Sequence, residues 1–485
     1  MRREVWHTVR VKTAEADTSN PQPLNAFTVF SWLWAGGVIS HMASYSEPLQ
    51  TITVVLFALA VIVLFRPTAS LLFFALLAAH IAYVFIRLPR MPNHAVFAAC
   101  VDLTILTAAA GQALVKRTWA INADQLYKTF APVVRIEILV LYFFVVFHKL
   151  NSGFFDNQYS CGAFMYMRLA EEYPFLPSGD WIRPWAIYLT IVTEAVIPIM
   201  LVVSGFRLAG LLLAFGFHFA LAMDPGDVVF NFSAALIALF FLFLPDNFAQ
   251  ALSSTLAPLR RAWRHPPNRV IWLVSRLCVY LLVPALFASL IFRQDIAMGL
   301  TQESSRAVWV AYAGFVLATF STTVLHRRLT FEPARQLLAV PSPGLLLFPA
   351  FLIFNGFLPY LGSKTETSFA MYSNLRTEGG ETNHWLMPAS LQIWDYQHDL
   401  VKIHRTSVGQ IQRLANRGFQ WTYFEFKWLM REYPNASVVF ERNGVVRRVR
   451  RVKDDPELMA PDNWVMRKML KFRPIADWDR PMCIH

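Results

Sequence analysis

Residues 131–162 read APVVRIEILVLYFFVVFHKLNSGFFDNQYSCG, and their pattern decides the fold class. An apolar run fills residues 131–148 and stops at Lys149, where a polar loop begins. A bilayer core about 30 Å thick needs roughly 20 apolar residues per helix, so this run is typical of a membrane-spanning helix. A lysine at the end of such a run is typical of the boundary between lipid and water.

Similar apolar runs, bounded by charged residues or by Pro and Gly, fill most of the first 361 residues. They lie near 25–46, 50–65, 69–86, 94–115, 131–148, 185–204, 207–222, 228–246, 269–292, 307–326 and 344–361. Several are short, which is typical of tilted or re-entrant segments. We therefore expect an all-α polytopic membrane bundle of about 9 to 11 transmembrane helices with a small C-terminal α+β extramembrane domain.

The composition agrees with this fold class. Of the 485 residues, 55% are hydrophobic and only 16% are charged, unlike an ordinary soluble protein. The net charge of +12 does not indicate nucleic-acid binding, because no groove-reading motif accompanies it and basic residues collect beside lipid headgroups. The four cysteines show neither CxxC nor metal-ligand spacing, so we expect no metal. Membrane lipid is the expected partner.

The basic residues favour one orientation in the membrane. Arg2, Arg3, Arg10 and Lys12 precede the first run, and alternate connections between runs are also basic. Cytoplasmic loops of membrane proteins carry such an excess, so we expect a cytoplasmic N-terminus and a C-terminal domain on the outer side. No small-residue cleavage site follows the polar N-terminal segment, so we expect no removed signal peptide.

Four segments follow from the composition. A cytoplasmic N-terminal segment covers 1–24, a transmembrane domain 25–250, additional transmembrane helices 251–361 and an extramembrane domain 362–485. Within the last segment, 418–432 has helical spacing, and a strand begins at Leu400. The dipeptide Asn443-Gly444 sits between two alternating runs, which predicts a hairpin turn.

Polar residues inside the apolar runs are candidates for a site, because burying them in hydrocarbon is unfavourable unless they are paired or hydrated. With the orientation above, five of them share one level near the outer face, namely His41, His94, Lys149, His218 and Asn231. Their common depth predicts a cavity that opens outward. Asp102 and Glu194 are expected to lie deeper.

Each of these residues also has a structural interpretation. A lone histidine such as His41 or His80 usually bonds a backbone carbonyl, and a buried carboxylate such as Asp102 often ties two helices together. Lys149 either extends its ammonium into the headgroups or, when partly desolvated, serves as a general base. Three further residues are expected to be structural partners, namely Arg135, Glu137 and Arg276.

The order of these features resembles a known family. FHKLNSGFFDNQYSCG at 147–162 is followed by TEAVIPIMLVVSGFRLAG at 193–210 and GFHFALAMD at 216–224. This succession is similar to the HTTM (horizontally transferred transmembrane) family, which includes the vitamin K-dependent gamma-carboxylase, over roughly residues 25–250. A weaker likeness continues in PYLGSKTETSFAMYSNLRTEGGETNHW at 359–385, which looks like the junction of such proteins with their outer domain.

The resemblance implies a mechanism and a cofactor. Lys149 would be the base that deprotonates reduced vitamin K or a related quinol. Oxygenation would then make a base strong enough to take the γ-proton of a substrate glutamate, which would take up carbon dioxide. His218 and His94 would be catalytic, and Glu194, Asn231 and His41 would surround the quinol. A peptide or protein substrate would approach from the outer face.

Departures from the family leave alternatives open. The outer domain is smaller than that of the animal carboxylase, and Leu-Gly-Ser-Lys follows Pro359-Tyr360 where the carboxylase has a histidine close by. Quinol epoxidation without carboxylation is therefore one alternative. Others are a transporter or channel, or a scaffold that binds a partner through Thr365–Trp385. Cys161 and Cys483 would lie outside, either as a disulfide or as free thiols.

Overall fold

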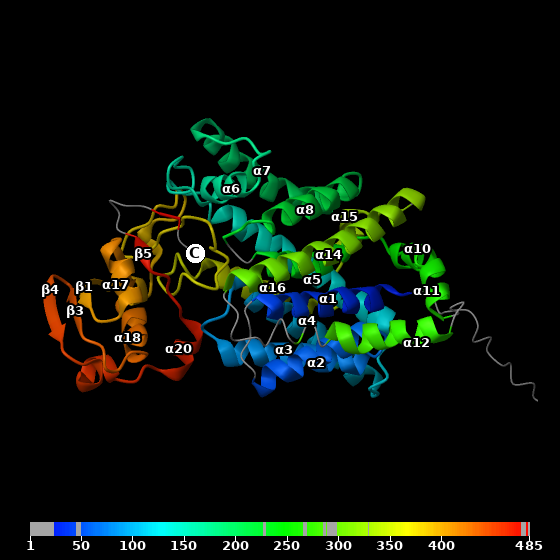
Figure 1. Ribbon diagram of the computed structural model, residues 1–485, viewed down its shortest axis with the longest axis horizontal. Helices are drawn as coiled ribbons and strands as arrows, with labels where there is room; N and C mark the ends of the chain where they lie inside the picture. Colours follow the sequence, from blue (N-terminus) through cyan, green and yellow to red (C-terminus); the bar gives the residue numbers. More distant parts are fainter. Residues whose placement is uncertain are drawn as a thin grey trace, which may run out of the picture.

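The computed structural model describes residues 24–44, 50–226, 229–264, 269–284, 288, 298–327, 329–476 and 482–483. A bundle of helices forms one end of the molecule, and a small domain with a β-sheet is stacked on the other end (Figure 1). The predictions about the N-terminal segment 1–23 and its processing lie outside the described residues, as does the end of the 269–292 run.

The bundle is built from apolar helices of very different length. Their bounds are α1 (Ala26–Ser44), α2 (Thr51–Phe65), α3 (Ser70–Arg87), α4 (Asn93–Lys116), α5 (Ala123–Phe147), α6 (Cys161–Glu172), α7 (Arg183–Val202), α8 (Arg207–Leu221), α9 (Phe230–Phe241), α10 (Phe248–Thr255), α11 (Ala257–Arg264), α12 (Arg269–Leu277), α14 (Met298–His326), α15 (Ala334–Leu337) and α16 (Leu347–Phe357). Helix α1 lies inside this group, in contact with α2, α5, α9 and α14.

Five described helical segments are long and apolar enough to cross a membrane. They are Ser70–Arg87, Asn93–Lys116, Ala123–Phe147, Asp180–Val202 and Arg306–His326. Shorter apolar helices lie at Thr51–Phe65, Arg207–Leu221, Phe230–Phe241 and Pro343–Phe357. The described chain is therefore a largely helical structure compatible with a membrane protein, and five of its helices reach spanning length by these criteria.

The corner between α7 and α8 is formed by the Arg-x-x-Gly sequence at residues 207–210. Arg207 is fully buried and donates to the carbonyls of Leu201 and Val202, which α7 leaves unpaired at its end. At Gly210, an added Cβ would lie 2.7 Å from the Cβ of Met200. The arginine therefore caps one helix, and the glycine lets the next helix approach it closely.

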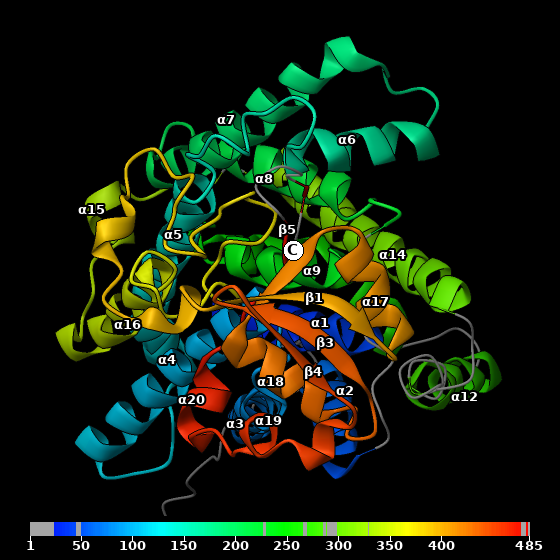
Figure 2. The same cartoon turned by 90° about the vertical axis from the view of Figure 1, so that its left-hand side faces the viewer.

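The C-terminal domain is an antiparallel sheet with helices on it, which confirms the expected α+β character. Its order is β4-β3-β1-β2-β5, with β1 at Leu400–Thr406, β2 at Phe419–Thr422, β3 at Val438–Arg442, β4 at Val445–Val449 and β5 at Ile475–Ala476. Its helices are α17 (Gly409–Asn416), α18 (Tyr423–Arg431), α19 (Pro456–Met459) and α20 (Trp464–Met469). The sheet faces the viewer in Figure 2.

Two predictions for this domain are confirmed, and one is wrong in part. The strand beginning at Leu400 is β1, and the hairpin turns at Asn443 and Gly444, with φ of 52° and 74°. The segment 418–432 is not one helix, because Phe419–Thr422 pairs with β1 and β5 as a strand. Thr422 then caps α18 by accepting from the Glu425 amide, so the helix begins only after the strand ends.

Replacement of Gly210 by alanine should destabilise the protein by about 1–3 kcal/mol, because the new methyl group overlaps Met200 across the α7–α8 corner. Gly205→Ala is the matched control, since nothing lies within 4 Å of its Cβ position. Thermal unfolding in detergent compares the two. An equal effect of both variants contradicts the close approach.

Candidate functional site

A cavity of about 530 Å³ lies among α4, α5, α6, α7 and α8. Most of its wall is apolar, and its polar groups include Asn93, His94, Lys149 and Glu194. Three of the residues predicted from the sequence, His94, Lys149 and Glu194, therefore face one space although they come from three helical segments. The volume lies within the range of about 300–1,000 Å³ that is typical of small-molecule sites.

Lys149 is bound inside this cavity and does not extend toward solvent. Its side chain is 5% exposed, and Nζ donates to Glu194 Oε2 at 2.5 Å. Nζ also lies 5.6 Å from the centre of the Phe154 ring. The pair thus joins the end of α5 to the middle of α7. A buried charge without its partner is strongly destabilising, so both side chains must stay in contact. The pair therefore fixes the position of α5 relative to α7.

The other side of the cavity leads to a second polar group. His94 lines both the large cavity and a small inner pocket, which it shares with His41, His80 and Asn231. His94 Nε2 lies 3.4 Å from His41 Nδ1, and His94 Nδ1 has no hydrogen-bond partner among the described residues. His41 and Asn231 therefore stand behind His94, next to the inner pocket.

Asp102 ties helices together at the end of this polar group. Its two oxygens contact His80 Nδ1 at 2.6 Å and accept from Trp34 Nε1 at 2.9 Å. Asp102 thus joins α4 to α3 and α1, which agrees with its interpretation as an interhelical tie. Glu137 is held in the same way by Thr104 at 2.5 Å.

His218 bonds another aromatic residue and does not line the cavity. Its Nε2 lies 2.8 Å from the hydroxyl of Tyr142, and its Nδ1 has no hydrogen-bond partner among the described residues. Its neighbour on α8, Phe217, does line the cavity. Arg135 is a structural partner as expected, since it donates to the carbonyls of Leu242 and Leu337.

Sequence reasoning missed one wall of the cavity. Phe369, Met371 and Tyr372 line it, although they follow α16 and belong to the connection that leads to the C-terminal domain. Four non-glycine residues of this stretch have positive φ, namely Thr367, Phe369, Tyr372 and Asn374. Bulky and β-branched side chains disfavour that conformation, and such strain gathers at functional sites.

Hydrogen bonds hold this strained segment in place. The Phe369 amide donates to Asn93 Oδ1 at 2.7 Å, and Asn355 Nδ2 donates to the Thr367 carbonyl at 2.8 Å. Lys364 is buried and donates to Thr367 Oγ1, and burial lowers the pKa of its amine to about 8. The sequence signal was the density of Asn and Thr in Thr365–Trp385, much of which packs on the bundle.

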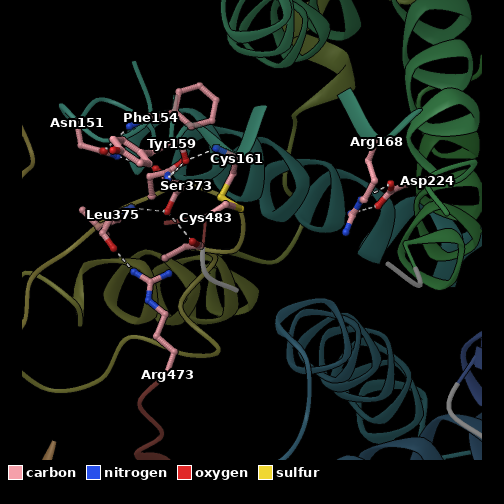
Figure 3. Close-up of a disulfide and its surroundings, with 12 residues drawn as sticks. Asn151, Phe154, Tyr159, Cys161, Arg168, Asp224, Ser373, Leu375, Arg473 and Cys483 are labelled. Carbon is pink, nitrogen blue, oxygen red and sulfur yellow. Dashed lines mark hydrogen bonds and ion pairs between the residues drawn. A yellow bond between two sulfur atoms is a disulfide. The ribbon is translucent and has the colours of Figure 1, made fainter. Parts of the chain in front are cut away.

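A disulfide holds the start of α6, next to Gly162 in the cavity lining. Cys161, the first residue of α6, is bonded to Cys483 near the C-terminus (Figure 3). The Cys161 amide also donates to Asn374 Oδ1 at 2.7 Å. Farther along α6, Arg168 forms an ion pair with Asp224 beyond α8, as the same view shows. Helix α6 is therefore held at both ends over the cavity.

No protein-family model, curated protein or solved structure matches this chain. The resemblance to the HTTM family therefore rests on motif residues alone. Their places are the end of α5 for Lys149, the corner between α7 and α8 for Arg207 and Gly210, and α8 for His218. Among the described residues, no group of three His, Cys, Asp or Glu side chains is arranged to hold a metal ion.

Removing one partner of the Lys149–Glu194 ion pair should destabilise the protein more than removing both partners together. Glu194→Leu or Lys149→Met alone leaves an unpaired buried charge and should lower the free energy of unfolding by about 3–5 kcal/mol. The double variant should lose less free energy of unfolding than the two single variants added together. Asp180→Asn, which breaks the exposed pair with Arg183, is the control and should change it by less than about 1 kcal/mol. Additive losses in thermal unfolding argue against the pair.

The disulfide should be visible on a gel. The protein should migrate differently with and without reductant, and Cys483→Ser should abolish that difference, whereas Cys100→Ser should keep it because Cys100 is free. Loss of the cross-link should lower the stability by about 2–4 kcal/mol. A mobility difference that survives Cys483→Ser excludes this pairing.

Proposed function

We propose that this protein is a multi-pass membrane enzyme of the gamma-carboxylase-like class, which binds a reduced quinone in the Lys149 cavity. One observation carries the proposal. Lys149, Glu194 and His94 line one cavity whose remaining wall is mostly apolar, with Lys149 and Glu194 in direct contact. An amphipathic ligand with a polar head and a greasy body fits such a space.

The lining of the cavity supports a ligand that enters from lipid. Leu189 on α7 and Leu212 and Leu213 on α8 line the cavity and are also exposed on the outside of the bundle. The cavity is therefore open sideways between two apolar helices. A quinone with a hydrocarbon tail would place its ring toward Lys149 and its tail toward these leucines.

Glu194 gives Lys149 a place to leave its proton. At 2.5 Å, the Glu194 carboxylate is placed to receive a proton from the Lys149 ammonium when a ligand hydroxyl group comes close. The free amine then accepts the proton of a ligand hydroxyl group. His94 also lines the cavity, and its imidazole offers a second proton donor or acceptor beside the ligand.

When bound, a reduced quinone with oxygen supplies a base strong enough to remove the γ-proton of a glutamate, which then takes up carbon dioxide. The protein's own residues would exclude water and hold the ring, with Phe369 and Tyr372 as the strained wall. His218 does not line the cavity and bonds Tyr142, so any role it has is to position neighbouring residues. Quinol epoxidation alone uses the same groups, and both reactions belong to the proposal.

Membrane placement is part of the same proposal. Five described helices are long enough to span a bilayer, and the distribution of Arg and Lys favours a cytoplasmic N-terminus. A disulfide persists in oxidising compartments, which supports an outer position for Cys161, Cys483 and the C-terminal domain. A peptide substrate would then reach the polar end of the cavity from the outer side.

Purified protein should epoxidise a reduced vitamin K analogue, with or without incorporation of labelled carbon dioxide into a glutamate peptide. Lys149→Ala should lower the rate by about 10²–10⁴-fold, the usual contribution of a general base. Lys402→Ala, which removes an exposed lysine on β1, should have no effect.

Equal rates for the natural protein and Lys149→Ala remove Lys149 from the mechanism. Absence of turnover, together with proton flux in proteoliposomes that Asp102→Asn abolishes, supports a transporter instead. One dominant cross-linked partner of Thr365–Trp385 in native membranes supports a scaffold.

A further inference from the structure

Helix α20 exposes its apolar residues and turns a charged residue inward, which is the reverse of a helix in water. Trp464, Val465, Met466 and Met469 are exposed, whereas Arg467 turns inward. The guanidinium of Arg467 lies 4.1 Å from the centre of the Trp428 ring, and its side chain is only 14% exposed. A surface helix normally buries its apolar residues and exposes its charges. This inversion is favourable only where the surroundings of α20 are themselves apolar.

The position of α20 supplies such surroundings. Lys468 Nζ donates to the carbonyls of Ile86 at 2.8 Å and Leu88 at 2.9 Å, where α3 ends. The Trp464 ring meets the edge of Phe85 with 6.0 Å between centroids, and Phe85 and Ile86 are themselves exposed. Helix α3 is of spanning length, and Figure 1 shows α20 beside its end. The apolar face of α20 therefore continues the outer surface of a membrane-length helix.

A second apolar patch lies near another such helix. Trp385, Leu386 and Ile393 are exposed on the connection that leads into the outer domain. Trp385 stacks on Phe155 at 4.7 Å, and Phe155 contacts Tyr188 in α7 at 5.7 Å. Two separate parts of the outer domain thus present exposed tryptophan beside the ends of two membrane-length segments, 70–87 and 180–202.

We propose that α20 and the 385–393 connection insert into the headgroup region of a lipid bilayer and hold the outer domain on the membrane. Tryptophan gathers at this depth, and interfacial helices sink their apolar face about 5–10 Å into the boundary between headgroups and acyl chains. Lys468 ties α20 to the end of α3, so both helices are held at the same level. The inference rests on the membrane placement proposed above, and it is independent of any catalytic activity.

This insertion has a consequence for the cavity. The domain that carries α20 also supplies Lys471, whose carbonyl accepts from the Thr365 and Glu366 amides. Thr365 begins the segment that leads to the strained wall at Phe369 and Tyr372. A bilayer that holds α20 would therefore also hold the outer wall of the cavity in register with the helices.

Spin labels at three exposed valines test the proposal. Val465→Cys lies on α20, Val192→Cys on α7 and Val446→Cys on β4, and these side chains are 53%, 55% and 59% exposed. Figure 1 shows β4 at the end of the molecule farthest from the bundle. Each label is placed in the full chain with Cys100→Ser and Cys278→Ser, which leaves the disulfide intact. The protein is studied in nanodiscs, and accessibility to oxygen is compared with that to a water-soluble nickel chelate.

The labels at 465 and 192 should be more accessible to oxygen, and the label at 446 more accessible to nickel. A label at Met469, on the same face of α20, should agree with 465. If the label at 465 is accessible to nickel while the label at 192 is accessible to oxygen, the interfacial position of α20 is wrong but the membrane placement stands. Nickel access at 192 overturns the membrane placement and this proposal with it. A label at 465 shielded from both reagents shows a protein contact and also overturns the proposal.

Discussion

The ion pair between Lys149 and Glu194 is the contact on which the rest of the site depends. It joins the end of α5 to the middle of α7 in a space lined mainly by apolar side chains. Charges so far from water remain stable only while each keeps its partner, so the pair determines the distance between the two helices. The corner at Arg207 then directs α8 back along α7, and α8 adds a further wall to the cavity.

Around this pair, the rigid and the adaptable parts of the wall have different compositions. The wall at Phe369 and Tyr372 consists of strained residues that hydrogen bonds hold in place. The wall formed by α7 and α8 contains the exposed leucines Leu189, Leu212 and Leu213. Polar groups are thus fixed where a reacting group would bind, and the opening is made of side chains that can change rotamer without breaking a hydrogen bond.

Deeper in the bundle, polar residues serve specificity of packing. Asp102 contacts Trp34 and His80, so one carboxylate ties three helices together. Leucine-rich helices can slide past one another at little cost in an apolar solvent, whereas a misplaced carboxylate would lose its partners. The group behind His94 therefore sets the position of the cavity's inner wall as well as its chemistry.

Features that depend on neighbouring residues could be predicted from the sequence, and features that depend on residues distant in the chain could not. Apolar runs, the Asn443-Gly444 turn and the strand at Leu400 are set by neighbouring residues, and the structure contains a helical bundle, the hairpin and β1. The segment 418–432 failed as a single helix because pairing with β1 and β5, which are distant in sequence, outweighed its helical spacing. Apolar length alone also could not decide how many helices reach spanning length.

The sequence by itself determined the apolar helical class and the place of Lys149 at the end of a helix. Only the tertiary structure decided that Glu194 is the partner of Lys149, that Cys161 meets Cys483 across 322 residues, and that Phe369 closes the cavity. The physical reason is that burial and periodicity are local properties of a chain. The partner of a charge or a thiol depends on where the whole chain folds back.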